Sequence, residues 1–122
     1  MTISALLIGI IALEHVWFLC LEIFFWRKPL GLRTFKMTQE IADKSAVLAA
    51  NQGLYNGFLA AGLLWGLFLD GQPHALAVKT FFLSCVAAAG FFGGITVNRR
   101  IFFLQAVPAI LALFMLWGIP GM

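Results

Sequence analysis

The chain has 122 residues, of which 62% are hydrophobic and 11% charged, and its mean hydropathy is +0.98. This composition lies far outside that of soluble domains and is typical of membrane proteins. So short and apolar a chain has no room for a soluble catalytic domain, a nucleotide-binding βαβ unit or a repeat array. The net charge of +3 by itself would suit nucleic-acid binding, but the positions of the charges argue against it.

Four apolar stretches follow one another along the sequence, at residues 3–26, 46–69, 75–97 and 101–119. Each has the roughly 20 residues that a helix needs to cross the hydrocarbon core of a bilayer. The sequence therefore predicts an all-α, polytopic membrane protein, a four-transmembrane-helix bundle that forms a single domain over residues 1–122. No small-residue cleavage site is evident in the first stretch, so we expect that helix to be retained.

Basic residues gather in two of the three connections. Arg99 and Arg100 lie in the third connection, and Lys79 stands alone near the second. By the positive-inside rule, connections one and three are cytoplasmic and both termini lie on the non-cytoplasmic side of the membrane. The charge then marks topology and attraction to lipid headgroups, and we expect no nucleic acid as partner. The first connection and its edges hold the other basic residues, Arg27, Lys28, Arg33, Lys36 and Lys44.

The first connection turns at Pro29 and Gly31 and then continues as a polar segment. Thr38 is a predicted N-cap, and Glu40 and Lys44 form a predicted i,i+4 pair on the turn that follows. The second helix should therefore begin directly after Thr38, with its first turns outside the bilayer.

The third and fourth predicted helices are joined only by residues 98–100, and so short a link requires an antiparallel hairpin. Pro108 lies inside the fourth helix, where it should produce a kink or release a carbonyl. Small residues that permit close helix packing recur in the second and third helices. These are Gly53 with Gly57, Gly62 with Gly66, and Gly90 and Gly93, of which the last two should leave space for a pocket.

Three polar residues lie inside the first apolar stretch: Glu14, His15 and Glu22. A charge at the bilayer centre costs about 2.5–3.5 kcal/mol even on the lenient insertion scale, so these residues need compensating partners. At about 100° per residue, His15 and Glu22 fall within about 20° of each other on the helix, while Glu14 flanks them. Two acids and a histidine on one helix favour a functional role, because a purely structural network could use amides.

The second helix carries a predicted partner surface made of Asn51, Gln52, Tyr55 and Asn56, which span about 140° of the helical wheel. Counting from the cytoplasmic ends of the helices places Glu22, this surface and Gln105 at similar depth. We therefore expect a polar pocket in the cytoplasmic half of the bundle that narrows toward Glu14 and His15. The alternative is that the polar side chains only bond to one another and set helix register.

The sequence shows no cofactor motif and no cluster of metal-ligand spacing. Cys20 and Cys85 both fall inside predicted spans, without a second cysteine or histidine nearby that would complete a metal site. We therefore expect neither a zinc site, nor a disulfide framework, nor a bound cofactor.

Several motifs together resemble those of the small bacterial inner-membrane family catalogued as domain of unknown function 1304. They are the Leu13-Glu-His15 segment, the run NQGLYNGF at residues 51–58, and Gln105 followed by Pro108-Ala109. The resemblance covers nearly the whole chain and implies a four-helix, multi-pass protein of the bacterial inner (cell) membrane, without an established activity. In length and helix number the chain is also similar to small multidrug-resistance antiporters and to membrane-associated eicosanoid and glutathione enzymes, but their other signature residues are missing.

We interpret the chain as a proton-linked transporter or a small-molecule-binding membrane protein. Its partners would be the lipid bilayer, a small-molecule or proton ligand, and further copies of itself in a homodimer or higher homo-oligomer. In this interpretation Glu14 and Glu22 hold charge or exchange protons, His15 relays them, and the amide surface positions the ligand. Two alternatives remain: a membrane-embedded enzyme that acts on a lipid or quinone-like substrate with His15 or Glu22 as general base, and an accessory or structural protein.

Overall fold

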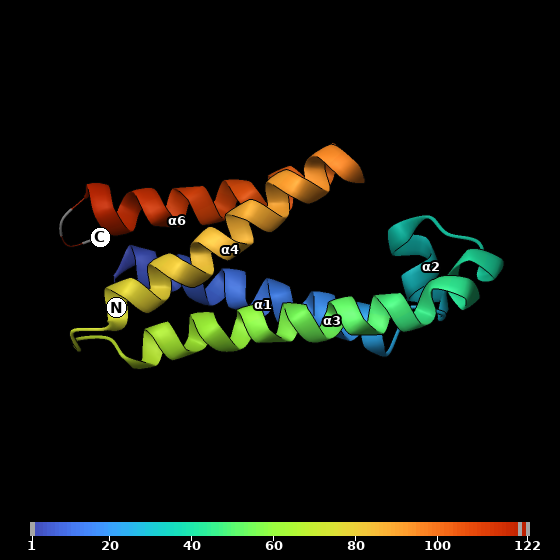
Figure 1. Cartoon of the computed structure of the whole chain (residues 1–122), viewed down its shortest axis with the longest axis horizontal. Helices are drawn as coiled ribbons and strands as arrows, with labels where there is room; N and C mark the ends of the chain where they lie inside the picture. The colour runs from blue at the N-terminus through green and yellow to red at the C-terminus, as the bar shows by residue number, and fades with distance from the viewer. Residues whose placement is uncertain (1, 120, 122) are drawn as a thin grey trace. The chain divides into compact units, whose positions relative to one another are not determined.

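The computed structural model describes residues 2–119 and 121, and this part of the chain contains helices and no strand (Figure 1). A long helix α1 (Ile3–Ile23) is followed by the short α2 (Pro29–Phe35) and by the longest helix, α3 (Gln39–Phe68). After a turn come α4 (Ala75–Thr96), α5 (Arg99–Ile101), the π-helix η1 (Phe102–Ala106) and α6 (Val107–Gly118). The prediction of an all-α protein is confirmed for the described residues.

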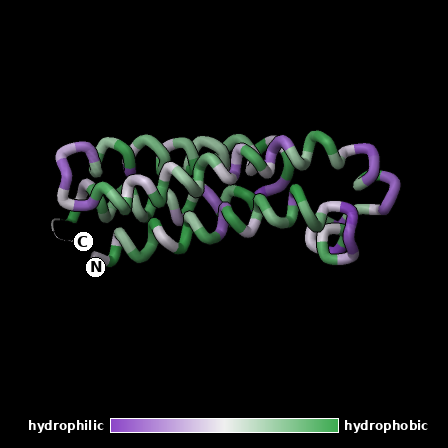
Figure 2. Tube along the Cα trace, turned by 90° about the horizontal axis from the view of Figure 1, so that it is seen from below, coloured by the Kyte–Doolittle hydropathy of each residue, from purple (hydrophilic) through white to green (hydrophobic). Residues whose placement is uncertain are grey.

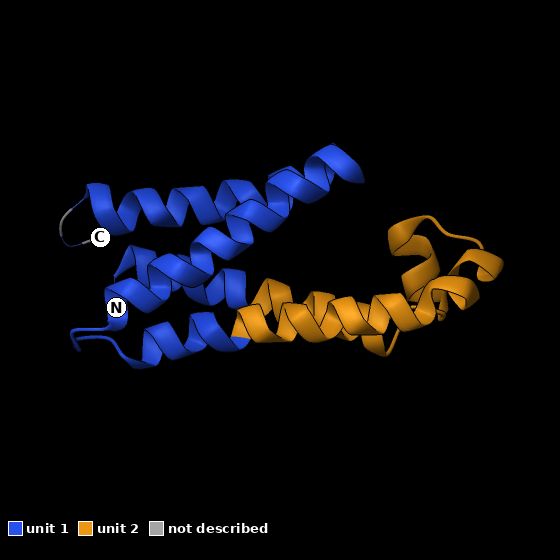
Figure 3. Cartoon of the chain, viewed as in Figure 1, with its two compact units in different colours: residues 1–12, 61–122 blue, residues 13–60 orange. Residues whose placement is uncertain are grey.

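The chain divides into two compact units (Figure 3). Unit 1 contains residues 1–12 and 61–122, and unit 2 contains residues 13–60. Helices α1 and α3 each contribute to both units, α2 belongs to unit 2, and α4 to α6 belong to unit 1.

In unit 2, α1 and α3 pack in antiparallel directions through the first glycine pair of α3. A Cβ atom added at Gly53 would lie 2.9 Å from Ile23 Cγ1 and 3.0 Å from Glu22 Cβ, and one added at Gly57 would lie 2.7 Å from Leu19 Cδ1. Larger residues at these two positions would push the helices apart. The small residues thus serve close packing within the chain, as the sequence predicts.

The start of α3 is the one that the sequence predicts. The Ile41 N–H donates a hydrogen bond to Thr38 Oγ1 at 3.3 Å, which makes Thr38 the N-cap. Lys44 Nζ lies 3.0 Å from Glu40 Oε1, so the expected i,i+4 pair forms on the exposed side of the first turns.

Helix α2 corrects the expectation that the first connection is only a turn and a polar segment. Pro29 occupies the first helical position, where its fixed φ and missing N–H suit a helix start. At Gly31, an added Cβ would overlap the carbonyl oxygens of Phe25 and Trp26, so only glycine allows α2 to lie this close to the preceding turn. The Trp26 ring packs on Phe35 at a centroid distance of 4.7 Å, which holds the far end of α2 in place.

In unit 1, α4 packs on both of its neighbours along the chain. A Cβ added at Gly62 of α3 would overlap the ring of Phe82. On the other side, Gly90 faces Ala106, and a Cβ added at Gly93 would lie 2.7 Å from Ile101 Cγ2. From Gly90 to Gly93 the residue numbers increase along α4, while the residues opposite them decrease from Ala106 to Ile101. The two segments therefore form the predicted antiparallel hairpin. The expectation that Gly90 and Gly93 leave space for a pocket is wrong, because the returning helix fills that space.

The π-helix η1 ends directly before the segment that contains Pro108. The Val107 N–H donates to the Phe102 carbonyl, five residues earlier, instead of to the usual partner four residues earlier. Proline has no N–H to offer the carbonyl four residues before it, so the regular pattern is already interrupted at this point.

Lys79, which the sequence shows as an isolated basic residue, is buried in unit 1 with only 5% of its surface exposed. Its ammonium lies 2.7 Å from Asp70 Oδ1 in the turn between α3 and α4. Gly66 makes the room, since a Cβ there would lie 2.8 Å from Lys79 Cγ. The long side chain thus packs its stem against α3 and brings its charge to the turn.

Among the described residues, three helical segments are long and apolar enough to cross a membrane: α1, α4 and the segment Arg99–Gly118. The tube in Figure 2 shows these segments as predominantly hydrophobic, with hydrophilic residues concentrated in the connections. The predicted span at residues 46–69 lies within α3, which is not among these segments. Its polar residues at positions 51, 52, 55 and 56 lower the hydropathy of the helix.

Candidate functional site

The buried carboxylate of Glu22 is the centre of the candidate site in unit 2. Glu22 is the second-last residue of α1 and is 5% exposed. Its Oε1 accepts a hydrogen bond of 2.5 Å from the side-chain amide of Asn56 on α3, which is also buried. Oε2 has no hydrogen bond from the part of the chain that the structure describes. A buried carboxylate with one free oxygen is able to accept a bond from a ligand.

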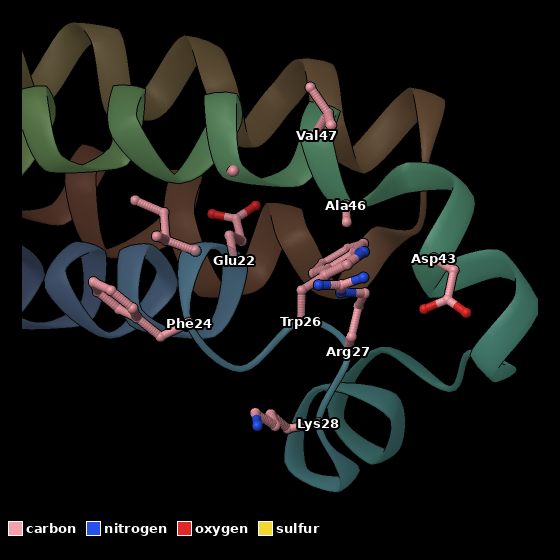
Figure 4. A pocket seen from close by; sticks show the side chains of 10 residues that line it. Glu22, Phe24, Trp26, Arg27, Lys28, Asp43, Ala46 and Val47 are labelled. Carbon is pink, nitrogen blue, oxygen red and sulfur yellow. The ribbon is translucent and has the colours of Figure 1, made fainter.

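A pocket of about 470 Å³ opens beside Glu22 (Figure 4). Glu22 and apolar residues of α1 and α3 line one part of it. Trp26, Arg27 and Lys28, which follow the end of α1, line another part, and Asp43 of α3 completes it. The volume falls within the range of about 300–1,000 Å³ that is usual for small-molecule sites.

The charged groups of the pocket differ in burial and in partners. Glu22 is buried, whereas Arg27, Lys28 and Asp43 are exposed. Asp43 Oδ1 accepts a hydrogen bond of 2.9 Å from Gln39 Nε2. Within residues 2–119 and 121, neither Arg27 nor Lys28 forms an ion pair. The pocket therefore combines the buried carboxyl group of Glu22 with two unpaired cations and the carboxylate of Asp43 at its exposed rim.

The residues around the pocket are held in place by the fold of the first connection. Trp26 Nε1 donates a hydrogen bond of 3.0 Å to Ser45 Oγ of α3. The Lys28 N–H donates to the Phe25 carbonyl at 3.0 Å, and Lys28 is the N-cap residue of α2. The backbone that carries Arg27 and Lys28 is thus fixed on both sides.

Glu14 and His15 lie deeper along α1 and do not line this pocket. His15 is fully buried, and its ring contacts Phe18 edge to face at a centroid distance of 5.3 Å. Its Nδ1 lies 3.9 Å from Glu14 Oε1, which is longer than a hydrogen bond. His15 and Glu22 are both buried, while the Glu14 side chain is 24% exposed.

The amide surface predicted on α3 is only partly turned toward Glu22. Asn56 is buried, but Asn51, Gln52 and Tyr55 are exposed. On a helix, Asn56 stands about 60° from Gly53, whereas Asn51 and Tyr55 stand about 160° from it. Since Gly53 faces α1, Asn56 faces α1 as well and the other three cannot. The expectation that all four residues line an inward pocket is therefore wrong for Asn51, Gln52 and Tyr55.

Gln105, the remaining candidate, lies half-buried in η1 of unit 1. A role for it beside Glu22 stays a prediction. Among the described residues there is no group of three histidine, cysteine or acidic side chains that could hold a metal ion.

Of the residues that line the pocket, sequence reasoning named only Glu22 as a site residue, and it missed the charged and indole side chains of Trp26, Arg27, Lys28 and Asp43 as well as the apolar ones. The sequence analysis assigns Arg27 and Lys28 to topology and to attraction by lipid headgroups. The available signal was their position, since they follow Glu22 within six residues along the chain. Asp43 could be associated with them only once α3 was known to pack beside the end of α1.

Comparison with known proteins gave two matches. The family model described as "Protein of unknown function (DUF1304)" matches residues 9–117, which include every residue of the candidate site. The "Uncharacterized protein YpaA" of Lactococcus lactis subsp. lactis (strain IL1403) is 32% identical over 116 residues, which make up 93% of this chain and 96% of the relative. No solved structure gave a significant match.

Proposed function

The chain belongs to the DUF1304 family, and on that premise we propose that it is a membrane protein which binds a small, partly apolar molecule through a cationic group. The observation that carries the proposal is the Glu22 carboxylate, which is buried, lines a pocket of about 470 Å³ and has one oxygen without a partner among the described residues. An unpaired buried carboxylate is costly, and a ligand ammonium would offset that cost.

The composition of the pocket supports a ligand with an apolar part. Ile23, Phe24, Ala46, Val47 and Ala50 all contribute to the lining. Trp26 adds an aromatic ring whose indole nitrogen is already engaged by Ser45, so the ring offers an apolar surface and a π-face for a cation. Binding sites of this kind usually combine apolar walls with a few placed polar groups.

The same proposal states that the chain crosses the bilayer four times and lies in the bacterial cell membrane. In unit 2, Gly53 and Gly57 of α3 lie against the last turns of α1, and in unit 1 a Cβ at Gly9 of α1 would lie 3.9 Å from Leu67 of α3. Helix α3 therefore accompanies α1 near both ends of α1. If α1 crosses the bilayer, α3 crosses it too, and the polar residues of α3 do not prevent this.

The depth of the pocket follows from the length of α1. At 1.5 Å per residue, its 21 residues measure about 31 Å, close to the hydrocarbon thickness of about 30 Å. Glu22, one residue before the helix ends, then stands at the boundary between hydrocarbon and headgroups. Asn51, Gln52 and Tyr55 lie near this level, where water and headgroups satisfy exposed polar groups. Glu14 stands near the middle of the bilayer.

Ligand binding is coupled to proton release if Glu22 binds either a proton or the ligand cation, but not both. The groups that face its carboxyl are the Asn56 amide and the rim charges Arg27, Lys28 and Asp43. Glu14 and His15, deeper along the same helix, would extend the proton path into the bilayer. Ligand binding should then release protons.

Calorimetric titration of the purified protein in detergent tests the proposal. The probe is phenethylammonium, a cation with an apolar ring, and phenethyl alcohol serves as an uncharged analogue of similar size. We expect Glu22→Gln to weaken phenethylammonium binding by about tenfold to 100-fold, since hydrogen bonds to charged groups contribute about 1.5–3 kcal/mol. Titrations in buffers of different ionisation enthalpy report the released protons.

The matched control is Glu40→Gln, which makes the same chemical change at an exposed side chain outside the pocket. It should leave the affinity for phenethylammonium unchanged. Equal affinity of the native protein for the amine and the alcohol, or an unchanged affinity in Glu22→Gln, would refute the proposed function.

A further inference from the structure

The charges of the unit 2 pocket are ordered from the inside to the rim. The negative charge of Glu22 is buried, and the positive charges of Arg27 and Lys28 are exposed beyond the end of α1. In Figure 4 the Glu22 carboxylate lies between the ribbons of α1 and α3, Arg27 lies next to Trp26, and Lys28 lies below the turn that follows α1, beside α2. A ligand cation at Glu22 therefore leaves its opposite end near two unpaired cations.

From this order we infer that the ligand is a small soluble zwitterion, which binds with an ammonium at Glu22 and a phosphate or carboxylate at Arg27 and Lys28. The inference rests on the proposed function, because it requires that the Glu22 pocket binds a cation. An anion at the rim would give Arg27 and Lys28 the partners that the described residues do not supply. A plain cation would instead be repelled by them.

The fourth charge of the pocket, Asp43, opposes an anion but does not cancel the two cations. Its Oδ1 already accepts a hydrogen bond from Gln39, and the net charge of the three rim residues is positive. Removing this carboxylate with Asp43→Asn should therefore strengthen binding of a zwitterion.

The order of the charges also distinguishes a soluble ligand from a lipid headgroup. In phosphatidylethanolamine the phosphate is attached to the glycerol and the ammonium is at the outer end. A lipid of the adjacent leaflet would thus place its phosphate deep and its ammonium outward. The pocket has the reverse order, with its carboxylate deep and its cations outward, which suits a zwitterion that enters from water with the ammonium first.

The test compares O-phosphoethanolamine with its two halves, ethanolamine and inorganic phosphate, by calorimetry on the full-length protein. We expect the zwitterion to bind at least about tenfold more tightly than either half, because it engages charged groups at both ends. The double variant Arg27→Gln/Lys28→Gln should remove this advantage and should strengthen phenethylammonium binding, because the two rim cations no longer repel it. Its matched control is Arg99→Gln/Arg100→Gln, which removes two exposed basic residues outside the pocket and should change nothing.

Three other outcomes would each contradict a specific part of the proposal. If phenethylammonium binds through Glu22 but the zwitterion shows no advantage over ethanolamine, the zwitterion inference is wrong and the proposed function stands. If neither amine binds, both are wrong. If phosphatidylethanolamine in mixed micelles displaces O-phosphoethanolamine, the ligand is a lipid headgroup and the argument from charge order is wrong. A thermal melt of each variant confirms that it is folded before titration.

Discussion

The pairing of Glu22 with Asn56 shows how a single amide can accommodate a buried acid between two helices. The amide donates to one carboxylate oxygen and leaves the other available, so it lowers the cost of burial without blocking the pocket. Both residues lie on the helix faces that meet where Gly53 and Gly57 allow α3 to approach α1 closely. The candidate site therefore depends on helix packing as much as on the acid itself.

Replacing Asn56 by leucine removes the amide donor from Glu22 and keeps a side chain of similar size. We expect Asn56→Leu to destabilise the protein by about 1–3 kcal/mol, the usual cost of leaving a buried polar group without its partner. Asn51→Leu, the same change at an exposed position on the same helix, should cost far less. Denaturant unfolding in detergent micelles measures both, and an equal effect of the two would mean that the Glu22–Asn56 bond contributes little.

At the scale of helices, α2 decides the form of the site. It is only seven residues long, yet Gly31 brings it against the carbonyls of Phe25 and Trp26, and Phe35 packs on the Trp26 ring. These contacts fold the first connection back on the end of α1 and fix the backbone of Arg27 and Lys28. The rim of the pocket is thus a product of α2.

Substitution of glycine by alanine at two positions separates these contacts. Gly31→Ala places a Cβ on backbone atoms that cannot move aside, so we expect α2 to detach, the melting temperature to fall and phenethylammonium binding to weaken. Gly9→Ala meets only Leu67 Cδ1 at 3.9 Å, an ordinary contact. It should be neutral or stabilise α1 by up to about 1 kcal/mol through helix propensity. Thermal unfolding measures both variants. A melting temperature of Gly31→Ala as high as that of Gly9→Ala would contradict this expectation.

For the whole molecule, the distribution of charge predicts the orientation in the membrane. Seven of the eight basic residues lie in the first and third connections, and Lys79, the eighth, is neutralised by Asp70 in the second. That pairing leaves the second connection without a free lysine or arginine among the described residues. The positive-inside rule counts lysine and arginine residues, so the seven-to-one distribution itself predicts that the first and third connections are cytoplasmic.

Labelling of single cysteines in intact cells tests this orientation. In a background with Cys20 and Cys85 replaced by serine, Gln72→Cys in the second connection should react with an impermeant maleimide from outside. Arg33→Cys in α2, the matched exposed position, should react only after the membrane is permeabilised. The opposite pattern would overturn both the orientation and the cytoplasmic position of the pocket.

Much of the architecture could be predicted from the sequence because it depends on local pattern. Hydrophobic length located the helices that begin at Ile3, Ala75 and Arg99 to within a few residues. The Thr38 cap located the start of α3, since a capping side chain acts on the backbone next to it. Family membership followed from motifs that lie close together along the chain.

Tertiary structure alone decided which polar side chains meet. The sequence identified Glu22 and Asn56 as candidates, but their bond depends on the angle at which α3 faces α1, and a rotation of α3 by about 140° would turn Asn51 toward α1 in place of Asn56. It also could not show α2, whose helix is too short for a periodic pattern and is stabilised by contacts with Trp26 and its neighbours. The pocket combines residues up to 28 positions apart, Glu22 to Ala50, and only packing brings such residues together.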